Sequence, residues 1–236
     1  MTTDDSAMSL IEHLEELRRR LIIIIAAVIV AATVGFVVSD PVLTLLRQPL
    51  PADYRTLFFI NVGGAFAVKV KIAVFVGIAL AMPVVLFQVW RFVTPGLTRQ
   101  ERRIVWPLLI ATLGLFGIGM AVGYVIIPFA LAFLLGFAEP GLQPLLTINE
   151  YIGFVTTMML AFGLVMEFPI VLILLARVGI LSYTRIAAQR RFVILGIVIF
   201  AVVVTPGGDP FSPSILSAVM YVLFEASLQV IRFIRK

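Results

Sequence analysis

One acidic side chain, Glu167, interrupts the apolar segment LAFGLVMEFPIVLILLA at residues 160–176. A charged side chain in the middle of a membrane span costs at least ~2.5–3.5 kcal/mol on insertion scales, so it should face protein or water rather than lipid tails. The plainer interpretations are that Glu167 is protonated or that it pairs with a polar group on a neighbouring helix; we favour a functional role. Pro169 removes the backbone donor for the Val165 carbonyl, which predicts a bend beside the acid.

A second set of carboxylates precedes three arginines in the segment SLIEHLEELRRRL, residues 9–21. The spacing predicts an amphipathic helix with one apolar stripe. This stripe consists of Leu10, Leu14, Leu17 and Leu21. The plainer interpretation is a solvated helix with its own i to i+4 ion pairs, such as Glu15 with Arg19 and Glu16 with Arg20. The functional interpretation is that the helix presents a carboxylate to a cationic partner at the membrane surface.

A third polar segment, QVWRFVTPGLTRQERRIVWP at residues 88–107, combines aromatic and basic side chains. Glu101 is its only acid, and the plainer interpretation is a charge-balanced turn in which Glu101 pairs with a neighbouring arginine. The aromatic residues Trp90, Phe92 and Trp106 suit the interfacial belt where a membrane helix leaves the lipid. The segment therefore predicts a turn at a membrane surface.

The residue types that most enzymes need are missing from the chain. It has no cysteine, and His13 is its only histidine, for which we expect a surface or helix-packing role. A zinc site and a serine triad both lack partners, and no glycine-rich segment has the spacing of a phosphate-binding loop. We therefore expect no enzyme activity, no metal and no other cofactor.

The composition predicts that membrane helices position these residues. Of the 236 residues, 61% are hydrophobic and 13% are charged, against roughly 25% charged residues in soluble domains. A helix needs about 20 apolar residues to cross the hydrocarbon core. We expect one all-α polytopic membrane domain over residues 1–236, with the last two helices short. Its six transmembrane helices are expected at approximately 21–39, 72–90, 104–128 (ending near Pro128), 151–176, 192–205 and 211–233.

The distribution of basic residues predicts the orientation of these helices. Only Arg47, Arg55, Lys69 and Lys71 lie on one side of a six-span arrangement, and the other lysines and arginines lie on the opposite side with both termini. That side is expected to be cytoplasmic. The net charge of +5 thus reflects membrane topology, so we expect lipid and not nucleic acid as a partner. The N-terminus has neither the basic start nor the cleavage site of a removed signal peptide.

The two longer outer connections are expected to pack as a cap over the outer face of the molecule. Residues 40–70 contain several prolines and a glycine pair, and residues 137–151 contain two glutamates and no basic residue. Thr147 or Asn149 has the side chain to cap the helix that follows.

Four segments together resemble one protein family. The motifs HLEELRRRL, MPVVLFQVWRFVTPGLTRQERR, AFGLVMEFP and VTPGGDPFS occur in the order, and at about the spacing, of the TatC family. The resemblance covers nearly the whole chain. It implies a concave bundle of six helices in the plasma membrane of a prokaryote, with both termini cytoplasmic. It also implies the central receptor of the twin-arginine pathway, which exports folded proteins by means of the proton-motive force.

The resemblance also implies functional residues. By motif position, Glu16, Glu101 and Phe92 match the family residues that bind the twin-arginine signal peptide, and we assign Arg18 and Leu21 to the same site. Two guanidinium groups side by side need acceptors, and arginine–carboxylate pairs provide strong ones. Glu167 matches the family's intramembrane glutamate. The residues expected to have structural or outer-loop roles are Pro49, Lys71, Pro83 and Asp209.

The implied partners are signal peptides of folded cargo and the single-span proteins TatA and TatB, in an oligomer of TatC–TatB units. Two other functions remain open from the residues alone. A small secondary transporter or channel would use Glu167 as a proton or cation site, although no basic partner lies at mid-span. A passive assembly scaffold would keep signal-peptide binding when Glu16 and Glu101 are both replaced by alanine.

Overall fold

The computed structural model describes residues 10–93, 105–138, 144–177 and 183–234. The regular elements in these ranges are helices, apart from one isolated bridge between two loops. Their bounds are α1 Leu10–Val37, α2 Ser39–Arg47, η1 Ala52–Tyr54 (a 3₁₀ turn), α3 Gly64–Val93, α4 Val105–Leu135, α5 Ile148–Val165, α6 Phe168–Arg177, α7 Tyr183–Ala188, α8 Arg190–Val204 and α9 Phe211–Ile234.

Five helical stretches in the described residues are long and apolar enough to cross a membrane. They are Ile11–Val37, Gly64–Phe92, Leu109–Leu135, Ile148–Ala176 and Phe211–Phe233. The chain is therefore an all-α multi-span membrane protein, as its composition predicts. Helix α8 has 15 residues and is about 22 Å long, which is shorter than the hydrocarbon core of about 30 Å.

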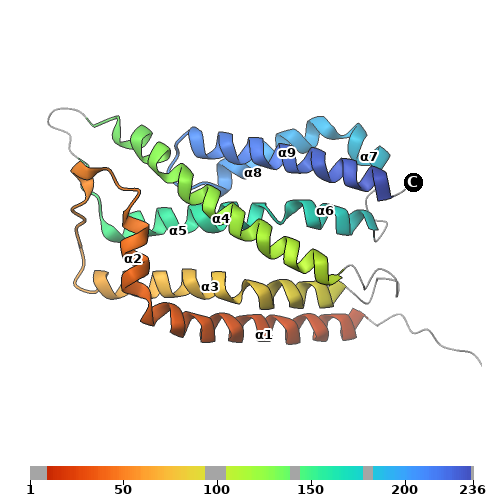
Figure 1. Cartoon of the computed structure of the whole chain (residues 1–236), viewed down its shortest axis with the longest axis horizontal. Helices are drawn as coiled ribbons and strands as arrows, with labels where there is room; N and C mark the ends of the chain where they lie inside the picture. The colour runs from red at the N-terminus through yellow and green to blue at the C-terminus, as the bar shows by residue number, and fades with distance from the viewer. Residues whose placement is uncertain (1–9, 94–104, 139–143, 178–182, 235–236) are drawn as a thin grey trace, which may run out of the picture.

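The long helices run roughly along one direction in a bundle with two distinct ends, and the short helix α2 runs across that direction (Figure 1). Helices α1 and α3 lie side by side, α5 and α6 follow one another through the middle, and α4 crosses them obliquely. Helices α7, α8 and α9 form the remaining side. The start of α1 and the end of α9 lie at one end, here named the termini end, and α2 lies at the other, the loop end (Figure 1).

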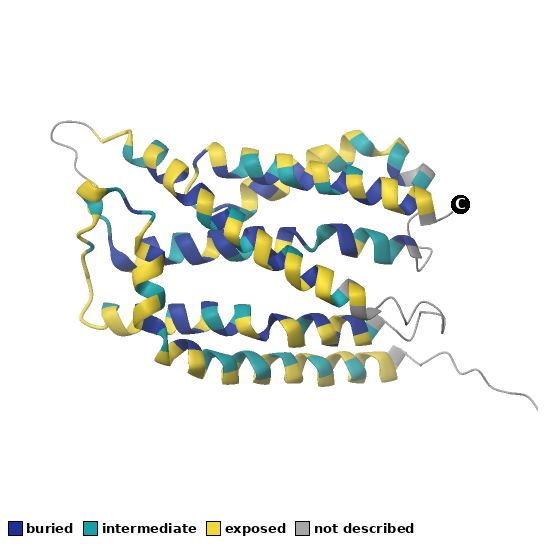
Figure 2. Cartoon of the chain, viewed as in Figure 1, coloured by how far each residue is buried: buried dark blue, intermediate teal, exposed yellow. Residues whose placement is uncertain are grey.

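The buried side chains are concentrated along α5 and the helix faces that meet it (Figure 2). Ile72, Ile127, Phe162 and Phe224, from four different helices, are fully buried in one apolar cluster. The outer faces expose many large apolar side chains, such as Val30 on α1. Lipid tails are as apolar as these side chains, so this exposure is what a membrane protein requires.

Small residues allow the helices to approach closely. A Cβ atom on Gly77 of α3 would lie 2.9 Å from the Cα of Ala32 on α1, and one on Gly119 of α4 would collide with the backbone of α5 at Phe162. Close backbone contact of this kind replaces the hydrophobic drive that is absent between helices in lipid.

Some helix boundaries differ from those expected. Helix α4 contains Pro128 and continues to Leu135, so the expected end near Pro128 is wrong. A proline removes one backbone hydrogen bond but does not end a membrane helix, because neighbouring helices and local adjustments satisfy the freed groups. The amphipathic N-terminal segment and the first span form one continuous helix, α1, and the separate helix α2 was not expected.

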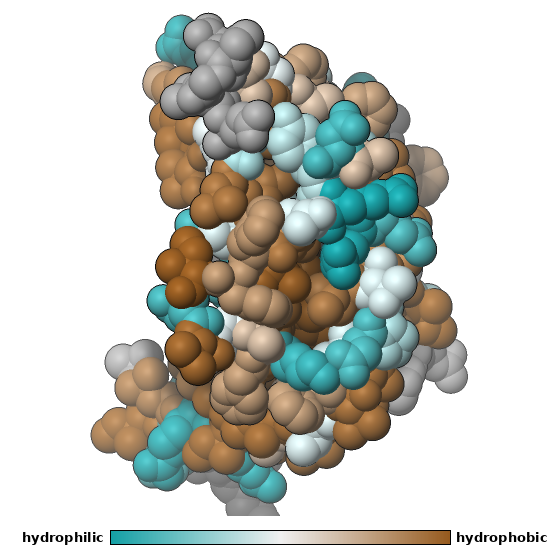
Figure 3. Space-filling model, turned by 90° about the vertical axis from the view of Figure 1, so that its left-hand side faces the viewer, coloured by the Kyte–Doolittle hydropathy of each residue, from teal (hydrophilic) through white to brown (hydrophobic). Residues whose placement is uncertain are grey.

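The loops at the loop end are joined to one another, as expected for a cap. Phe58 pairs with Thr147 in the isolated bridge: its amide donates to the Leu146 carbonyl and its carbonyl accepts from the Ile148 amide, both at 3.1 Å. The Thr147 hydroxyl accepts from the Glu150 amide and caps α5, which confirms one of the two expected caps. Hydrophilic side chains gather over part of this end, beside hydrophobic ones (Figure 3).

Candidate functional site

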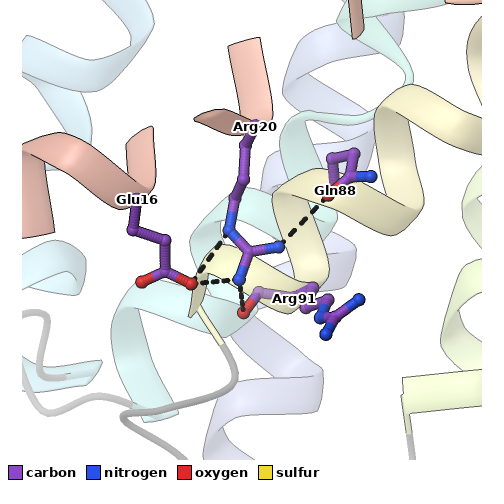
Figure 4. Close-up of polar contacts among 4 residues, drawn as sticks. All are labelled: Glu16, Arg20, Gln88 and Arg91. Carbon is purple, nitrogen blue, oxygen red and sulfur yellow. Dashed lines mark hydrogen bonds and ion pairs between the residues drawn. The ribbon is translucent and has the colours of Figure 1, made fainter. Parts of the chain in front are cut away.

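The first candidate site is a polar network at the termini end, between α1 and α3 (Figure 4). The Arg20 guanidinium donates through Nε to Glu16 Oε1 at 3.0 Å, and Nη2 contacts the same oxygen. It also donates through Nη1 to Gln88 Oε1 and through Nη2 to the Arg91 carbonyl, both at 3.2 Å. The expected i to i+4 pair of Glu16 and Arg20 is thus present, and it is fixed to the end of α3.

The carboxylate of Glu16 is only half satisfied in this network. Its side chain is 18% exposed, and Oε2 is buried without a hydrogen-bond partner. A buried acceptor without a donor costs about 1–3 kcal/mol, and more for a charged group. Glu16 Oε2 can therefore accept one additional hydrogen bond.

An aromatic pair lies on the same two helices. The His13 ring stacks on the Phe92 ring with centroids 4.3 Å apart and an interplanar angle of 20°. This contact places the sole histidine in helix packing, as expected, and holds the partly buried Phe92 beside the helix that carries Glu16. Arg18 and Leu21 are exposed on α1. Glu101 lies outside the described residues.

The second candidate site is an apolar groove of about 620 Å³. It is bordered by α5, α6, α8 and α9, and among the described residues that line it Glu167 is the one ionisable side chain. Oε1 of Glu167 is buried without a hydrogen-bond partner. Gly196 of α8 also lines the groove, and a Cβ atom there would meet nothing within 4 Å. The groove is thus an apolar surface that contains one unpartnered hydrogen-bond acceptor, Glu167 Oε1.

The position of Glu167 follows from a break in the helix. Helix α5 ends at Val165 and α6 begins at Phe168, with Glu167 in the turn between them. The Glu167 amide donates to the Leu164 carbonyl at 3.1 Å, three residues back rather than four. Pro169 supplies no donor for the Val165 carbonyl, and the helix expected over 151–176 is interrupted beside the acid and divided into α5 and α6. Since α6 has 10 residues, the acid lies about 15 Å along the axis from the termini end of that helix.

The residues expected to have structural roles are distributed over several helices. Lys71 Nζ donates to the backbone carbonyl of Asn149 at 2.9 Å and to its Oδ1 at 2.8 Å, joining α3 to α5. Asp209 is 2% exposed, and its Oδ1 accepts from the Ser212 amide at 2.7 Å in the first turn of α9. Pro83 lies inside α3. Pro49 lies beyond the end of α2.

Sequence reasoning did not single out Gln88 or the ion pair between Arg190 and Glu225. Gln88 lies in a quoted motif but has no charge, and only the fold shows that it is 8% exposed and bonded to Arg20. Arg190 donates to Glu225 at 3.2 Å and joins α8 to α9. The isolated glutamate near the end of the last apolar run was the one available signal for that pair.

Comparison with known proteins agrees with both the motifs and the fold. A family model described as Sec-independent protein translocase protein (TatC) matches residues 12–218. The TatC protein of Carboxydothermus hydrogenoformans is 36% identical over 233 residues, which cover 98% of this chain and 96% of the relative. The chloroplastic TATC protein of Pisum sativum is 32% identical, and the match covers 94% of this chain and 63% of the relative.

The fold comparison gives the same family. A crystal structure of the twin arginine translocase receptor TatC superimposes with a TM-score of 0.81 and 32% identity, covering 95% of this chain and 100% of that chain. The family model spans most of the chain, and the relatives are similar over nearly all of it. The chain therefore belongs to the TatC family of Sec-independent protein translocase proteins.

Proposed function

We propose that this protein is the receptor that binds twin-arginine signal peptides of folded cargo at its termini end. The observation that carries the proposal is that Glu16, with one unpartnered carboxylate oxygen, and Phe92 lie on the two paired helices α1 and α3 at the termini end. An arginine side chain supplies charge-assisted donors of the right kind. Phe92, held against His13, offers an apolar face to the hydrophobic part of a signal peptide or stacks on an arginine.

Glu101 is proposed as the second acceptor for the arginine pair. It follows the end of α3 in sequence, and the Arg91 carbonyl at that end already contacts Arg20. Arg18 and Leu21 extend the same surface along α1. In this proposal two carboxylates on adjoining segments give the site its preference for two adjacent guanidinium groups over one.

The membrane arrangement that we propose has six crossings. The start of α1 and the end of α9 lie at the same end of the bundle (Figure 1), which agrees with an even number of crossings. The crossing added to the five long helical stretches is α8, the fifth in chain order, and its length of about 22 Å leaves it shorter than the bilayer core. Both termini would then be cytoplasmic, in a prokaryotic plasma membrane. A transmembrane helix that is shorter than the bilayer core thins the lipid locally or recruits other helices.

The groove at Glu167 is proposed as the place where the transmembrane helix of a TatA or TatB partner docks. The lining is apolar apart from Glu167, so a single-span helix would bury its side chains there. A polar group on that helix would satisfy Oε1 of Glu167. Partner helices recruited beside the short α8 would form a transient pore through the membrane, and the proton-motive force would drive transport through it. Oligomers of TatC–TatB units would follow from repeated docking.

Signal-peptide binding is tested with the purified full-length chain and two peptides. One peptide carries the twin arginines, and the other carries two lysines at the same positions. We expect preferential capture of the arginine peptide, because lysine lacks the planar fork that binds a carboxylate through two donors. Glu16→Gln is expected to reduce this preference. Equal capture of the two peptides by the unaltered chain would contradict the proposal that this protein is the receptor for twin-arginine signal peptides.

Partner docking is tested by filling the groove. Gly196→Leu would place a side chain in open groove space without harming α8, since leucine forms helices better than glycine. Gly117→Leu on α4 is the matched control, because Gly117 also has open space around it but lies outside the groove lining. We expect partner crosslinking to fall only in the Gly196 variant. An equal yield in both variants would place the partner elsewhere.

A further inference from the structure

We propose that Arg20 is a positioning residue for the signal-peptide site. In this proposal Arg20 holds the Glu16 carboxylate by one oxygen and leaves the other oxygen for an arginine of the cargo. The inference rests on the proposed function of Glu16, and it adds a residue that does not itself contact the ligand. It also assigns a role to Gln88, which anchors Arg20.

The contacts of Arg20 explain why it serves as an anchor. All three guanidinium nitrogens are used: Nε and Nη2 contact Glu16, Nη1 donates to Gln88, and Nη2 also donates to the Arg91 carbonyl (Figure 4). Its side chain is 12% exposed. Because two of its acceptors belong to α3, Arg20 is held in place independently of Glu16.

The Arg20–Glu16 pair uses only one of the two carboxylate oxygens. Arginine–carboxylate pairs are frequently bidentate, with one nitrogen on each oxygen. Here both nitrogens contact Oε1, and Oε2 has no partner. Arg20 therefore fixes the direction of the carboxylate without saturating it. Since Oε2 is itself buried, the atoms around it have to move before an arginine of the cargo can reach it.

An opposite role for Arg20 would be that of a competitor. A resident arginine on Glu16 would then occupy the place of the cargo arginine and would have to leave. The two roles predict opposite signs. Removing a competitor, and with it a positive charge beside a cationic ligand, raises affinity, whereas removing an anchor lowers affinity. The bonds from Arg20 to α3 favour the anchor, because they would be lost if Arg20 left.

The test measures the dissociation constants of the twin-arginine and twin-lysine peptides with the full-length chain in lipid nanodiscs. The variants are Arg20→Gln, Arg20→Lys and Gln88→Leu. Arg19→Gln is the matched control, because Arg19 is the exposed neighbour and its replacement changes the charge equally. We expect Arg20→Gln to weaken arginine-peptide binding about tenfold or more and to reduce discrimination against lysine. Arg19→Gln should change affinity less than threefold.

The variants that keep the charge separate geometry from electrostatics. Arg20→Lys retains the positive charge but loses the planar guanidinium group with its several donors. Gln88→Leu changes no charge. Both variants should therefore weaken peptide binding if Arg20 acts by positioning Glu16. Thermal unfolding of each variant shows whether it folds. If Arg20→Gln does not fold, Arg20→Lys and Gln88→Leu still test whether Arg20 positions Glu16. Tighter binding in Arg20→Gln would establish the competitor role and overturn the proposal, as would equal effects at Arg19 and Arg20.

The outcomes for this proposal and for the receptor function are distinguishable. If the unaltered chain prefers the arginine peptide and the variants at Arg20 and Gln88 do so equally well, the positioning role is wrong and the receptor function stands. If the unaltered chain shows no preference, the receptor function and the inference that rests on it are both wrong.

Discussion

Replacing Glu167 by leucine should make the protein more stable and less able to bind its partner. Glu167 lines an apolar groove, and its Oε1 is buried without a hydrogen-bond partner. Leucine has a similar volume and no polar group, so it fits this lining without leaving an unsatisfied acceptor. Residues kept for function commonly reduce stability in this way.

The size of the gain follows from the burial of the side chain. A fully buried unsatisfied acceptor costs about 1–3 kcal/mol. Glu167 is only partly buried, so about half of that range, ~0.5–1.5 kcal/mol, should be recovered as free energy of unfolding. Partner binding should lose one polar contact within the membrane, about 0.6–1.7 kcal/mol. That loss corresponds to a factor of about 3 to 20 in the dissociation constant.

Two measurements check this prediction. Reversible unfolding in mixed micelles gives the free energy of unfolding, and site-specific crosslinking to the partner helix gives relative occupancy. Glu167→Gln is the control, since the amide keeps an acceptor and should retain more crosslinking than the leucine variant. A leucine variant that is less stable by more than about 1 kcal/mol would refute the reasoning, because Glu167 would then have a partner within the chain.

Three further substitutions test the structural contacts. Lys71→Met should lower the free energy of unfolding by about 1.5–3 kcal/mol through the lost bonds to Asn149, which are bonds to a charged donor; a double-mutant cycle with Asn149→Ala should show coupling between the two changes. Asp209→Ala should cost about 0.5–2 kcal/mol through loss of the cap of α9, and Asp209→Ser should restore most of it. Tyr151→Phe should cost about 1 kcal/mol, because the buried hydroxyl donates to the Leu46 carbonyl at 2.7 Å, and chemical denaturation would measure it.

The sequence predicted those features that depend on nearby residues. The apolar runs located the membrane helices because a span needs a fixed length of apolar chain. Pro169 predicted a local disturbance beside Glu167, since a proline removes the donor for the carbonyl four residues before it, although the division into α5 and α6 was not expected. Thr147 was predicted as a cap because capping also depends on neighbouring residues, within one helical turn. The family itself was evident from four quoted motifs.

The features that the sequence did not predict depend on contacts between distant segments. Arg20 lies 68 residues from Gln88 in sequence, and their hydrogen bond requires the α1–α3 pairing. Helix α2 is only nine residues long, too short for a membrane-span pattern. It is held by the hydroxyls of Tyr124 and Tyr151, which donate to carbonyls in its last turn. No local pattern in the chain predicts which carbonyls those tyrosines reach.

An unsatisfied carboxylate oxygen does not by itself distinguish a binding site from a structural ion pair. Among the described residues, Glu16, Glu167, Asp209 and Glu225 each have one buried oxygen without a partner. Asp209 caps α9 and Glu225 pairs with Arg190, so replacing either should lower stability. Glu167 alone among the four lines the groove, so its replacement should raise stability. Opposite signs at Asp209 and Glu167 would therefore separate a structural acid from one that is kept for a ligand.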